Sequence, residues 1–271
     1  MLRSLMILIS IAGILVQTGC GGALGTARSD GVPVPRPSSE ASSKSNPNPT
    51  PRFSPPPELK PSIAADPSFK SCNPYYPLVP GSQAKYAVKN ISGDFVNEVT
   101  VIVDAISGGK GKPVFTETAQ RVDPRKAEVE TTTRKYMCQG ERIEVISGVI
   151  DAKVGRTTAR LESKFSPAAT VMLDAASLTP GAEWSYSMAA EITTPGKPPV
   201  SRQAIWLNFE VKGSEDVTVP AGTFKTLHIA GKVKGRQIDE YYARGVGMVK
   251  RTSEDGSSWE LTHYSGLTPL P

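Results

Sequence analysis

The chain has 271 residues and a formal net charge of +5 at pH 7. Its lysines and arginines are scattered, whereas a nucleic-acid-binding protein gathers such residues on one face or helix, so no nucleic-acid partner is predicted. Eleven of the 24 prolines lie between Pro33 and Pro67. The composition therefore divides the chain into a Pro/Ser-rich segment and a globular part of about 200 residues, which is long enough to bury a hydrophobic core.

The N-terminus has the pattern of an export signal. Residues 1–4 carry one positive charge, Arg3, and residues 5–16 form an apolar run that is followed by small residues. This order is typical of a secretory signal peptide, and the run is shorter than the roughly 20 apolar residues of a membrane span. We therefore predict a signal peptide at residues 1–19.

Thr18-Gly19-Cys20 resembles a bacterial lipobox, in which signal peptidase II cleaves before a cysteine that carries a diacylglyceryl group. The resemblance departs from the motif at Gln17, where an aliphatic residue is usual. It implies lipidation of Cys20, incorporation of palmitate and a membrane as partner through the N-terminal lipid. The alternative is cleavage by ordinary signal peptidase, for example after Gly25 or Ala27, which would release a soluble secreted protein.

Residues 21–68 contain nine serines, eleven prolines and a single aromatic residue, Phe53. So few large apolar side chains cannot offset the entropy lost when a backbone becomes ordered. We predict a lipid-anchored, Pro/Ser-rich disordered linker over residues 20–68, which lifts the following domain off the membrane.

From residue 69 onward, apolar and polar side chains alternate with the period of two that half-buried strands require. In residues 69–80 the three prolines Pro74, Pro77 and Pro80 exclude a helix, so this stretch is an opening segment. Strands are expected at 83–89, 99–103, 114–122, 127–137, 142–154 and, in a short form, 160–165. Residues 168–176 fit either a helical turn or a further strand.

Leu-x-Pro-Gly occurs twice, at Leu78 and Leu178, and each copy is followed by a tyrosine at the same distance, Tyr86 and Tyr186. The spacing of 100 residues suggests two similar lobes, 69–170 and 171–271, although Pro-Gly also starts many unrelated strands. Further strands are expected at 200–211, 217–219, 224–233, 236–243, 248–252 and 259–263. Residues 220–222 (Pro-Ala-Gly) fit a three-residue hairpin loop with glycine at the left-handed site. The sequence thus predicts an all-β domain at 69–271, an antiparallel, strongly curved sheet or a sandwich.

Three segments resemble a known family. Residues 76–81 (YPLVPG), 217–224 (VTVPAGTF) and 241–250 (YYARGVGMVK) are similar to motifs of secreted or lipid-anchored bacterial domains of the DUF3108 type. One departure is Ala84, where the opening strand of the family usually has tryptophan; here tryptophan stands in the second copy, at Trp184. The resemblance implies an antiparallel β fold in the cell envelope and implies no enzyme activity.

Residues that carry chemistry in other proteins are isolated in this sequence. His228 and His263 have no second histidine, cysteine or acid at ligand spacing, so both are interpreted as structural, and neither a metal nor a cofactor is predicted. No Gly-x-Ser-x-Gly motif is present, and the glycines and lysines of 108–112 lack the spacing of a phosphate loop. Asp239 and Glu240 are adjacent in a strand and therefore face opposite ways.

Two cysteines remain after Cys20. An exported chain meets an oxidising compartment, so Cys72 and Cys138 are candidates for one disulfide, with two buried free thiols as the alternative.

Five aromatic residues on predicted strands are candidates to line a ligand groove, although aromatic strand residues usually fill the core: Trp184, Tyr186, Trp206, Tyr241 and Tyr242. We predict a non-enzymatic cell-envelope lipoprotein, lipid-anchored to a membrane, whose tethered β domain faces the periplasm or the exterior. That domain binds an envelope protein or an apolar ligand. The alternatives are a secreted soluble hydrolase without a recognisable motif and a structural wall-associated module.

Overall fold

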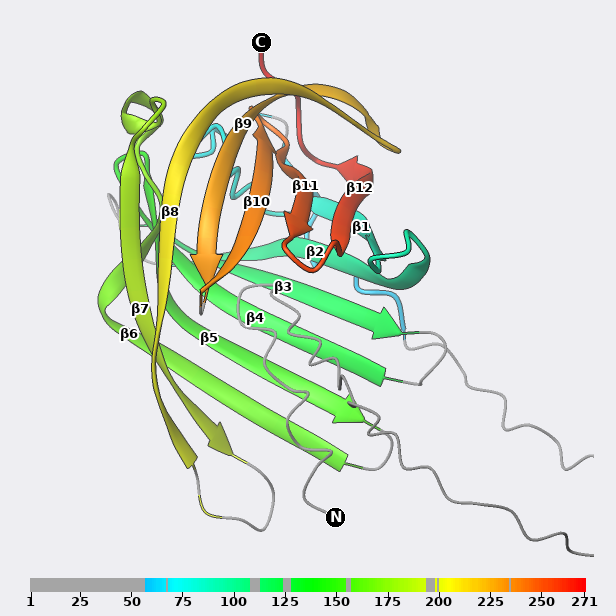
Figure 1. The fold of residues 1–271 in the computed structure, drawn as a ribbon, viewed down its shortest axis with the longest axis vertical. Coiled ribbons are helices and arrows are strands. Elements are labelled where there is room, and N and C mark those ends of the chain that lie inside the picture. Colours follow the sequence, from blue (N-terminus) through cyan, green and yellow to red (C-terminus); the bar gives the residue numbers. More distant parts are fainter. Residues whose placement is uncertain are drawn as a thin grey trace, which may run out of the picture. The chain divides into compact units, whose positions relative to one another are not determined.

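The computed structural model describes residues 57–66, 68–107, 113–123, 128–154, 157–193, 198, 200–233 and 235–271. These residues form twelve β-strands and one short 3-10 helix (Figure 1). The predicted signal peptide, Cys20 and most of the predicted linker lie outside the described residues. The elements are β1 (Gln83–Lys89), β2 (Phe95–Ser107), β3 (Val114–Asp123), β4 (Glu128–Gln139), β5 (Arg142–Val154), β6 (Thr157–Met172), η2 (Ala175–Ser177), β7 (Glu183–Thr193), β8 (Val200–Val219), β9 (Gly222–Val233), β10 (Arg236–Ala243), β11 (Gly247–Ser253) and β12 (Ser258–Ser265).

All strand pairs are antiparallel, and each strand pairs with the strands that precede and follow it in the sequence. The first strand, β1, also pairs with the last, β12, so the sheet closes on itself. Figure 1 shows β2 to β6 running side by side and the long β8 curving past β9. The prediction of an all-β, antiparallel, strongly curved sheet is confirmed.

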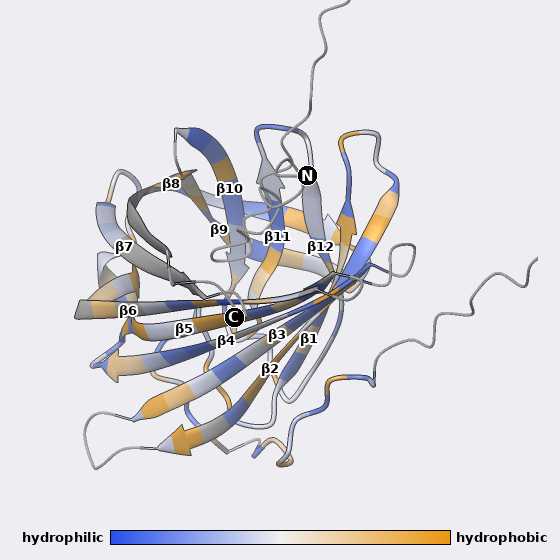
Figure 2. Ribbon diagram, turned by 90° about the horizontal axis from the view of Figure 1, so that it is seen from below, coloured by the Kyte–Doolittle hydropathy of each residue, from blue (hydrophilic) through white to orange (hydrophobic). Residues whose placement is uncertain are grey.

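The alternation of side chains along the strands sets the inner and outer faces. Along β1 every second residue is buried, and Figure 2 shows the same alternation of hydrophobic and hydrophilic residues on other strands. Residues that stand opposite each other in neighbouring strands share a face, so the strand register carries the inner face from Phe115 to Tyr136 and on to Val145. These residues belong to the hydrophobic core of the sheet.

The opening segment packs against this core. Leu78 is completely buried. Asn73, also completely buried, donates its side-chain amide to the carbonyl oxygens of Glu141 and Leu173 at 2.8 and 2.9 Å. The carbonyl oxygen of Pro74 accepts a hydrogen bond from the backbone of Gly245. These contacts with loops of both halves of the chain hold residues 69–80 to the sheet.

The ordered contacts begin before residue 69. Lys85 forms an ion pair with Glu58, and the side-chain amide of Gln83 donates to the carbonyl oxygen of Leu59 at 3.0 Å. Ser62 donates to Asp104 on β2. The last part of the predicted linker therefore lies along the outer face of β1 and β2, a contact that the Pro/Ser composition did not indicate.

The two Leu-x-Pro-Gly segments have the same backbone structure. Gly81 has φ +82° and donates to the carbonyl of Val103 at 2.7 Å; Gly181 has φ +85° and donates to the carbonyl of Val211 at 2.8 Å. Each valine in turn donates back to the residue after its glycine, at 3.1 and 2.9 Å. A left-handed φ favours glycine, which explains why both copies keep this residue.

The repeat extends through both six-strand halves, β1–β6 and β7–β12. The β2–β3 register shifts between Val103 and Ala105, and the β8–β9 register shifts between Val211 and Gly213. The β4–β5 register shifts at Lys135/Tyr136, and the β10–β11 register at Tyr241/Tyr242. Bulges bend strands at defined positions, so two halves with the same bulges share one backbone plan. The lobe boundary at 170/171 stays a prediction, because the described strands form one continuous sheet.

Three local predictions differ from the structure. The strand expected at 160–165 is part of the longer β6; of the two alternatives for residues 168–176, residues 168–172 are strand, and residues 175–177 form the 3-10 helix η2. The pairing of β6 with β5 skips residues 165–168, so Pro167 needs no ladder hydrogen bond. Residues 200–219 form one strand, β8, in place of separate strands at 200–211 and 217–219. At the β8–β9 hairpin Val219 pairs with Gly222, leaving two turn residues in place of three.

Candidate ligand-binding interior

Four aromatic rings form a continuous row on the inner face of the sheet. Trp184 stacks on Phe209 with ring centroids 5.2 Å apart, Phe209 stacks on Tyr186 at 5.9 Å, and Tyr186 meets the edge of Phe165 at 6.4 Å. The register explains the row, because Trp184 and Tyr186 on β7 stand opposite Phe209 and Leu207 on β8. All four rings are only partly buried although they face inward. All four side chains pack against the hydrophobic core and keep some accessible surface.

The other three predicted groove residues lie elsewhere. Trp206 is 62 % exposed and sits on the outer face of β8. Tyr241 stacks on His228 with centroids 4.7 Å apart, on the outer face of β10. Tyr242, the next residue, points inward and is buried. The five candidates therefore do not share one surface, because adjacent residues of a strand face opposite ways. Only Trp184 and Tyr186 belong to the aromatic row.

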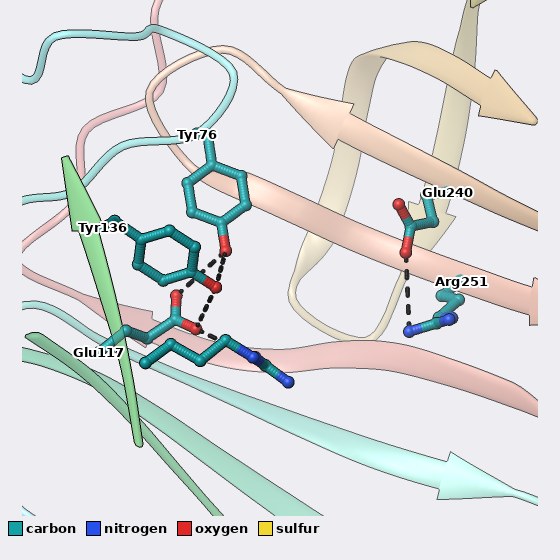
Figure 3. Close-up of polar contacts among 6 residues, drawn as sticks. Tyr76, Glu117, Tyr136, Glu240 and Arg251 are labelled. Atoms are coloured by element: carbon teal, nitrogen blue, oxygen red, sulfur yellow. Dashed lines mark hydrogen bonds and ion pairs between the residues drawn. The ribbon is translucent and has the colours of Figure 1, made fainter. Parts of the chain in front are cut away.

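A buried polar cluster lies on the inner face of β3 and β4. The Glu117 carboxylate accepts a hydrogen bond from the Tyr136 hydroxyl at 3.3 Å and lies 3.4 Å from the Tyr76 hydroxyl; the two hydroxyls are 3.0 Å apart (Figure 3). Arg134 forms an ion pair with the same carboxylate at 3.4 Å. We call these four residues the Glu117 cluster.

Burial dominates the protonation of the Glu117 cluster. It raises the pKa of Glu117, and the neighbouring Arg134, Tyr136 and Tyr76 offset this only in part. Burial and the negative charge of Glu117 also raise the pKa of Tyr76 and Tyr136. Burial would lower the pKa of Arg134, but the Tyr136 hydroxyl and Glu117 raise it overall. The guanidinium is therefore always charged, whereas burial favours the protonated form of Glu117 more than in an exposed glutamate.

A second ion pair lies on the inner face of β10 and β11. Arg251 lies 3.6 Å from Glu240, which also accepts a hydrogen bond from the Tyr242 hydroxyl at 2.9 Å. Arg251 is only 3 % exposed. Figure 3 shows this pair apart from the Glu117 cluster.

His228 has acidic neighbours that the sequence spacing did not reveal. Its Nε2 lies 2.8 Å from Asp239 and its Nδ1 lies 3.2 Å from Glu215. The three residues come from β8, β9 and β10, which the register places side by side. The interpretation of His228 as isolated is therefore wrong, although both ring nitrogens already face carboxylates and neither is directed at a nucleophile.

Cys72 and Cys138 are joined in the structure, with Cα atoms 6.3 Å apart. The bond links the opening segment to the end of β4. Within the described part of the chain, no cluster of histidine, cysteine and acidic residues could hold a metal ion. No helix in that part is long and apolar enough to cross a membrane.

A signal for the two inner ion pairs was present in the sequence. Glu117 stands at an apolar phase of its strand, two residues after Phe115, and Arg251 stands two residues after Val249. A charged residue in the buried phase of an alternating strand needs a buried partner. The partners themselves come from neighbouring strands, so only the register could identify them.

Comparison with known proteins identifies a family. The model of the DUF3108-like family matches residues 80–265 of the chain. The search of curated proteins gave no match. Among solved structures, the fold is similar to that of an inferred exported protein with a YmcC-like fold from Bacteroides fragilis NCTC 9343, with 14% identity and a TM-score of 0.48. It is also similar to that of an inferred lipoprotein from Parabacteroides distasonis ATCC 8503, with 13% identity and a TM-score of 0.48. Each comparison covers 72% of this chain and 100% of the other.

Proposed function

We propose that this chain, which belongs to the DUF3108-like family, is a non-enzymatic binding protein of the cell envelope. A lipid on Cys20 anchors it to a membrane, and the closed sheet binds an apolar or amphipathic ligand in its interior. The export pattern of residues 1–19 and the lipobox-like Thr18-Gly19-Cys20 support the envelope location and the anchor.

The aromatic row carries the ligand proposal. A ring that faces the inside of a closed sheet is usually covered by other side chains, because each buried aromatic residue removes a large apolar area from water. Here Trp184, Tyr186, Phe209 and Phe165 contact one another and still keep exposed surface. In addition, the indole nitrogen of Trp184 is buried without a hydrogen-bond partner in the structure. An apolar ligand along the row would cover the exposed ring surface.

The lipid anchor is tested by metabolic labelling. Labelled palmitate should enter the wild-type protein and be absent from the Cys20→Ser variant, because the thiol is the only attachment point for the diacylglyceryl group. The measurement is autoradiography of the protein after immunoprecipitation, with immunoblotting to equalise the loaded amounts. Equal labelling of both proteins would contradict the anchor and favour ordinary signal-peptidase cleavage.

Ligand binding is tested with N-phenyl-1-naphthylamine, a dye that fluoresces in apolar sites. The unlipidated full chain carrying Cys20→Ser, purified without detergent, should bind the dye saturably. Trp184→Ala should weaken binding about tenfold, because it removes one ring of the row and the apolar area it contributes. The titration is followed by the fluorescence of the dye.

Trp206→Ala is the matched control, since it removes the same ring type from the outer face, where Trp206 is 62 % exposed. We expect its dye affinity to equal that of the parent. Absence of saturable binding in the parent would refute the proposed function. Equal weakening by both tryptophan variants would place the ligand outside the aromatic row.

A further inference from the structure

We propose that Arg134 is the receptor for an anionic headgroup, a carboxylate or a phosphate, of an amphiphile whose apolar part lies along the aromatic row. The inference rests on the proposed function and names the class of ligand.

A comparison of equivalent positions in the two halves shows which inward-facing positions carry a large side chain. In the first half Glu117 stands opposite Arg134, and Arg134 opposite Gly148. At the equivalent positions of the second half Ile229 stands opposite Glu240, and Glu240 opposite Arg251. Gly148 therefore takes the place that Arg251 takes in the second half. At this position the second half has the long side chain of Arg251, whereas the first half has glycine and therefore no side chain.

The surroundings of Gly148 would admit a small side chain without a clash. A Cβ atom added there would meet only Cγ of Arg134 at 3.8 Å and the carbonyl oxygen of Thr133 at 4.0 Å. The stem of Arg134 is thus the nearest side chain on this part of the inner face. The next residue across the sheet, Ser163, is small and stands where the second half has Trp259. The stem of Arg134 is therefore flanked by small residues on β5 and β6.

Arg134 is less enclosed than its counterpart in the second ion pair. Its side chain is 18 % exposed, compared with 3 % for Arg251, although both face inward. Its contact with Glu117 is long for a charge-assisted hydrogen bond, at 3.4 Å. A guanidinium has five N–H donors in a fixed fork, so donors remain for a carboxylate or a phosphate, which a guanidinium binds in bidentate form.

The strand register brings one end of the aromatic row towards Arg134: Phe165 stands two residues after Ser163 on the same face of β6, and Ser163 and Arg134 both stand opposite Gly148. Burial raises the pKa of the Tyr186 hydroxyl to about 12, and the positive charge of Arg134 opposes this rise. Tyr186 in turn contacts both Phe209 and Phe165. The row therefore supplies apolar surface that leads to a cation, the arrangement that an amphiphile with one acidic headgroup requires.

Acidic groups near Arg134 modulate the site. Glu117 forms the ion pair, and Glu130, on the same face of β4, also interacts with Arg134. Burial raises the pKa of both glutamates, which weakens their competition with an incoming anion. On binding, the headgroup would lose hydration water and gain the contact with Arg134. Its negative charge would favour the protonated form of Glu117.

The test is displacement of N-phenyl-1-naphthylamine from the unlipidated full chain by three twelve-carbon amphiphiles, used below their micelle concentrations. Dodecanoate and dodecyl phosphate should displace the dye at concentrations roughly tenfold lower than dodecanol, because only the first two make a charge-assisted bond with Arg134. In Arg134→Gln this preference should disappear, while displacement by dodecanol stays unchanged. Arg142→Gln is the matched control, because Arg142 is 42 % exposed and pairs with Asp174 outside the row.

Glu117→Gln provides a second variant that keeps Arg134 and removes its competing carboxylate. It should strengthen dodecanoate binding at pH 7.5 about threefold or more and leave dodecanol binding unchanged. Equal displacement by all three amphiphiles in the parent would overturn the headgroup proposal and leave the proposed function standing. Failure of every amphiphile and of the dye to bind would instead refute the proposed function. A preference for only one of the two anions would distinguish a carboxylate from a phosphate ligand.

Discussion

Replacing both Cys72 and Cys138 by alanine should lower the free energy of unfolding by about 4 kcal/mol. The bond closes a loop with a sequence separation of 66, and in the chain-entropy model a loop of this size restricts the unfolded ensemble by about that amount. The measurement is urea denaturation of the oxidised parent and of the double variant, followed by tryptophan fluorescence. A lower midpoint would show the loss of stability, and a steeper slope would report the less compact unfolded chain that remains without the bond.

The same experiment contains its own controls. Thiol titration of the unfolded, unreduced parent that lacks Cys20 should find no free thiol, whereas two reactive thiols would contradict the bond in the protein. Reduction of the parent should reproduce the loss seen in the double variant. A reduced parent as stable as the oxidised one would show that the contacts of the opening segment suffice without the bond.

The disulfide holds the opening segment to the sheet. The opening segment consists of proline-interrupted backbone and makes no strand pair of its own, so side chains must hold it. Asn73 fixes it to two loop carbonyls, and the bond to Cys138 fixes it to β4. Tyr76, which belongs to the Glu117 cluster, lies in the same segment. Loss of the bond is therefore expected to disturb the inner polar cluster as well as the stability.

Strand positions were predictable because the inner and outer faces of this sheet differ in polarity. Alternation identified β1 at 83–89, which agrees with the structure. The extent of β6 was harder to predict, because residues 165–168 lose their pairing with β5 while the strand itself continues to Met172. The alternation of apolar and polar residues shows where a chain is extended, but the position of a bulge depends on the pairing with the neighbouring strand.

The candidate site was predictable only in part for a related reason. Trp184 and Tyr186 were identified as aromatic residues on a strand, and they lie in the row. Phe165 was not selected, because the sequence does not show that β6, β7 and β8 bring the four rings together. Arg134 looks like one of many scattered basic residues until the register places it beside Glu117.

Replacing Leu78 by alanine, or Leu178 by alanine, should lower the free energy of unfolding by about 2–5 kcal/mol in each case, the usual cost of removing a buried leucine side chain. Leu78 is completely buried, Leu178 is 7 % exposed, and both belong to one core cluster. We expect Leu78→Ala to be at the upper end of this interval and Leu178→Ala slightly below it. Ile91→Ala is the control, because Ile91 is 77 % exposed and such substitutions change stability by about 0.5 kcal/mol or less.

The number of transitions in these variants separates two views of the internal repeat. If the halves β1–β6 and β7–β12 were independent lobes, Leu78→Ala would destabilise only the first, and denaturation would show two steps. The β6–β7 and β12–β1 pairs join the halves into one closed sheet, and the cluster that holds Leu78 and Leu178 spans both. A single cooperative transition is therefore expected for each variant. Tryptophan fluorescence, which reports Trp184, Trp206 and Trp259 in the second half, and far-ultraviolet circular dichroism, which reports the whole sheet, should give the same loss of free energy. Non-coincident curves from the two probes would show that the repeat retains two folding units, and that the aromatic row, which joins β6 to β7 and β8, is assembled only after each unit has folded.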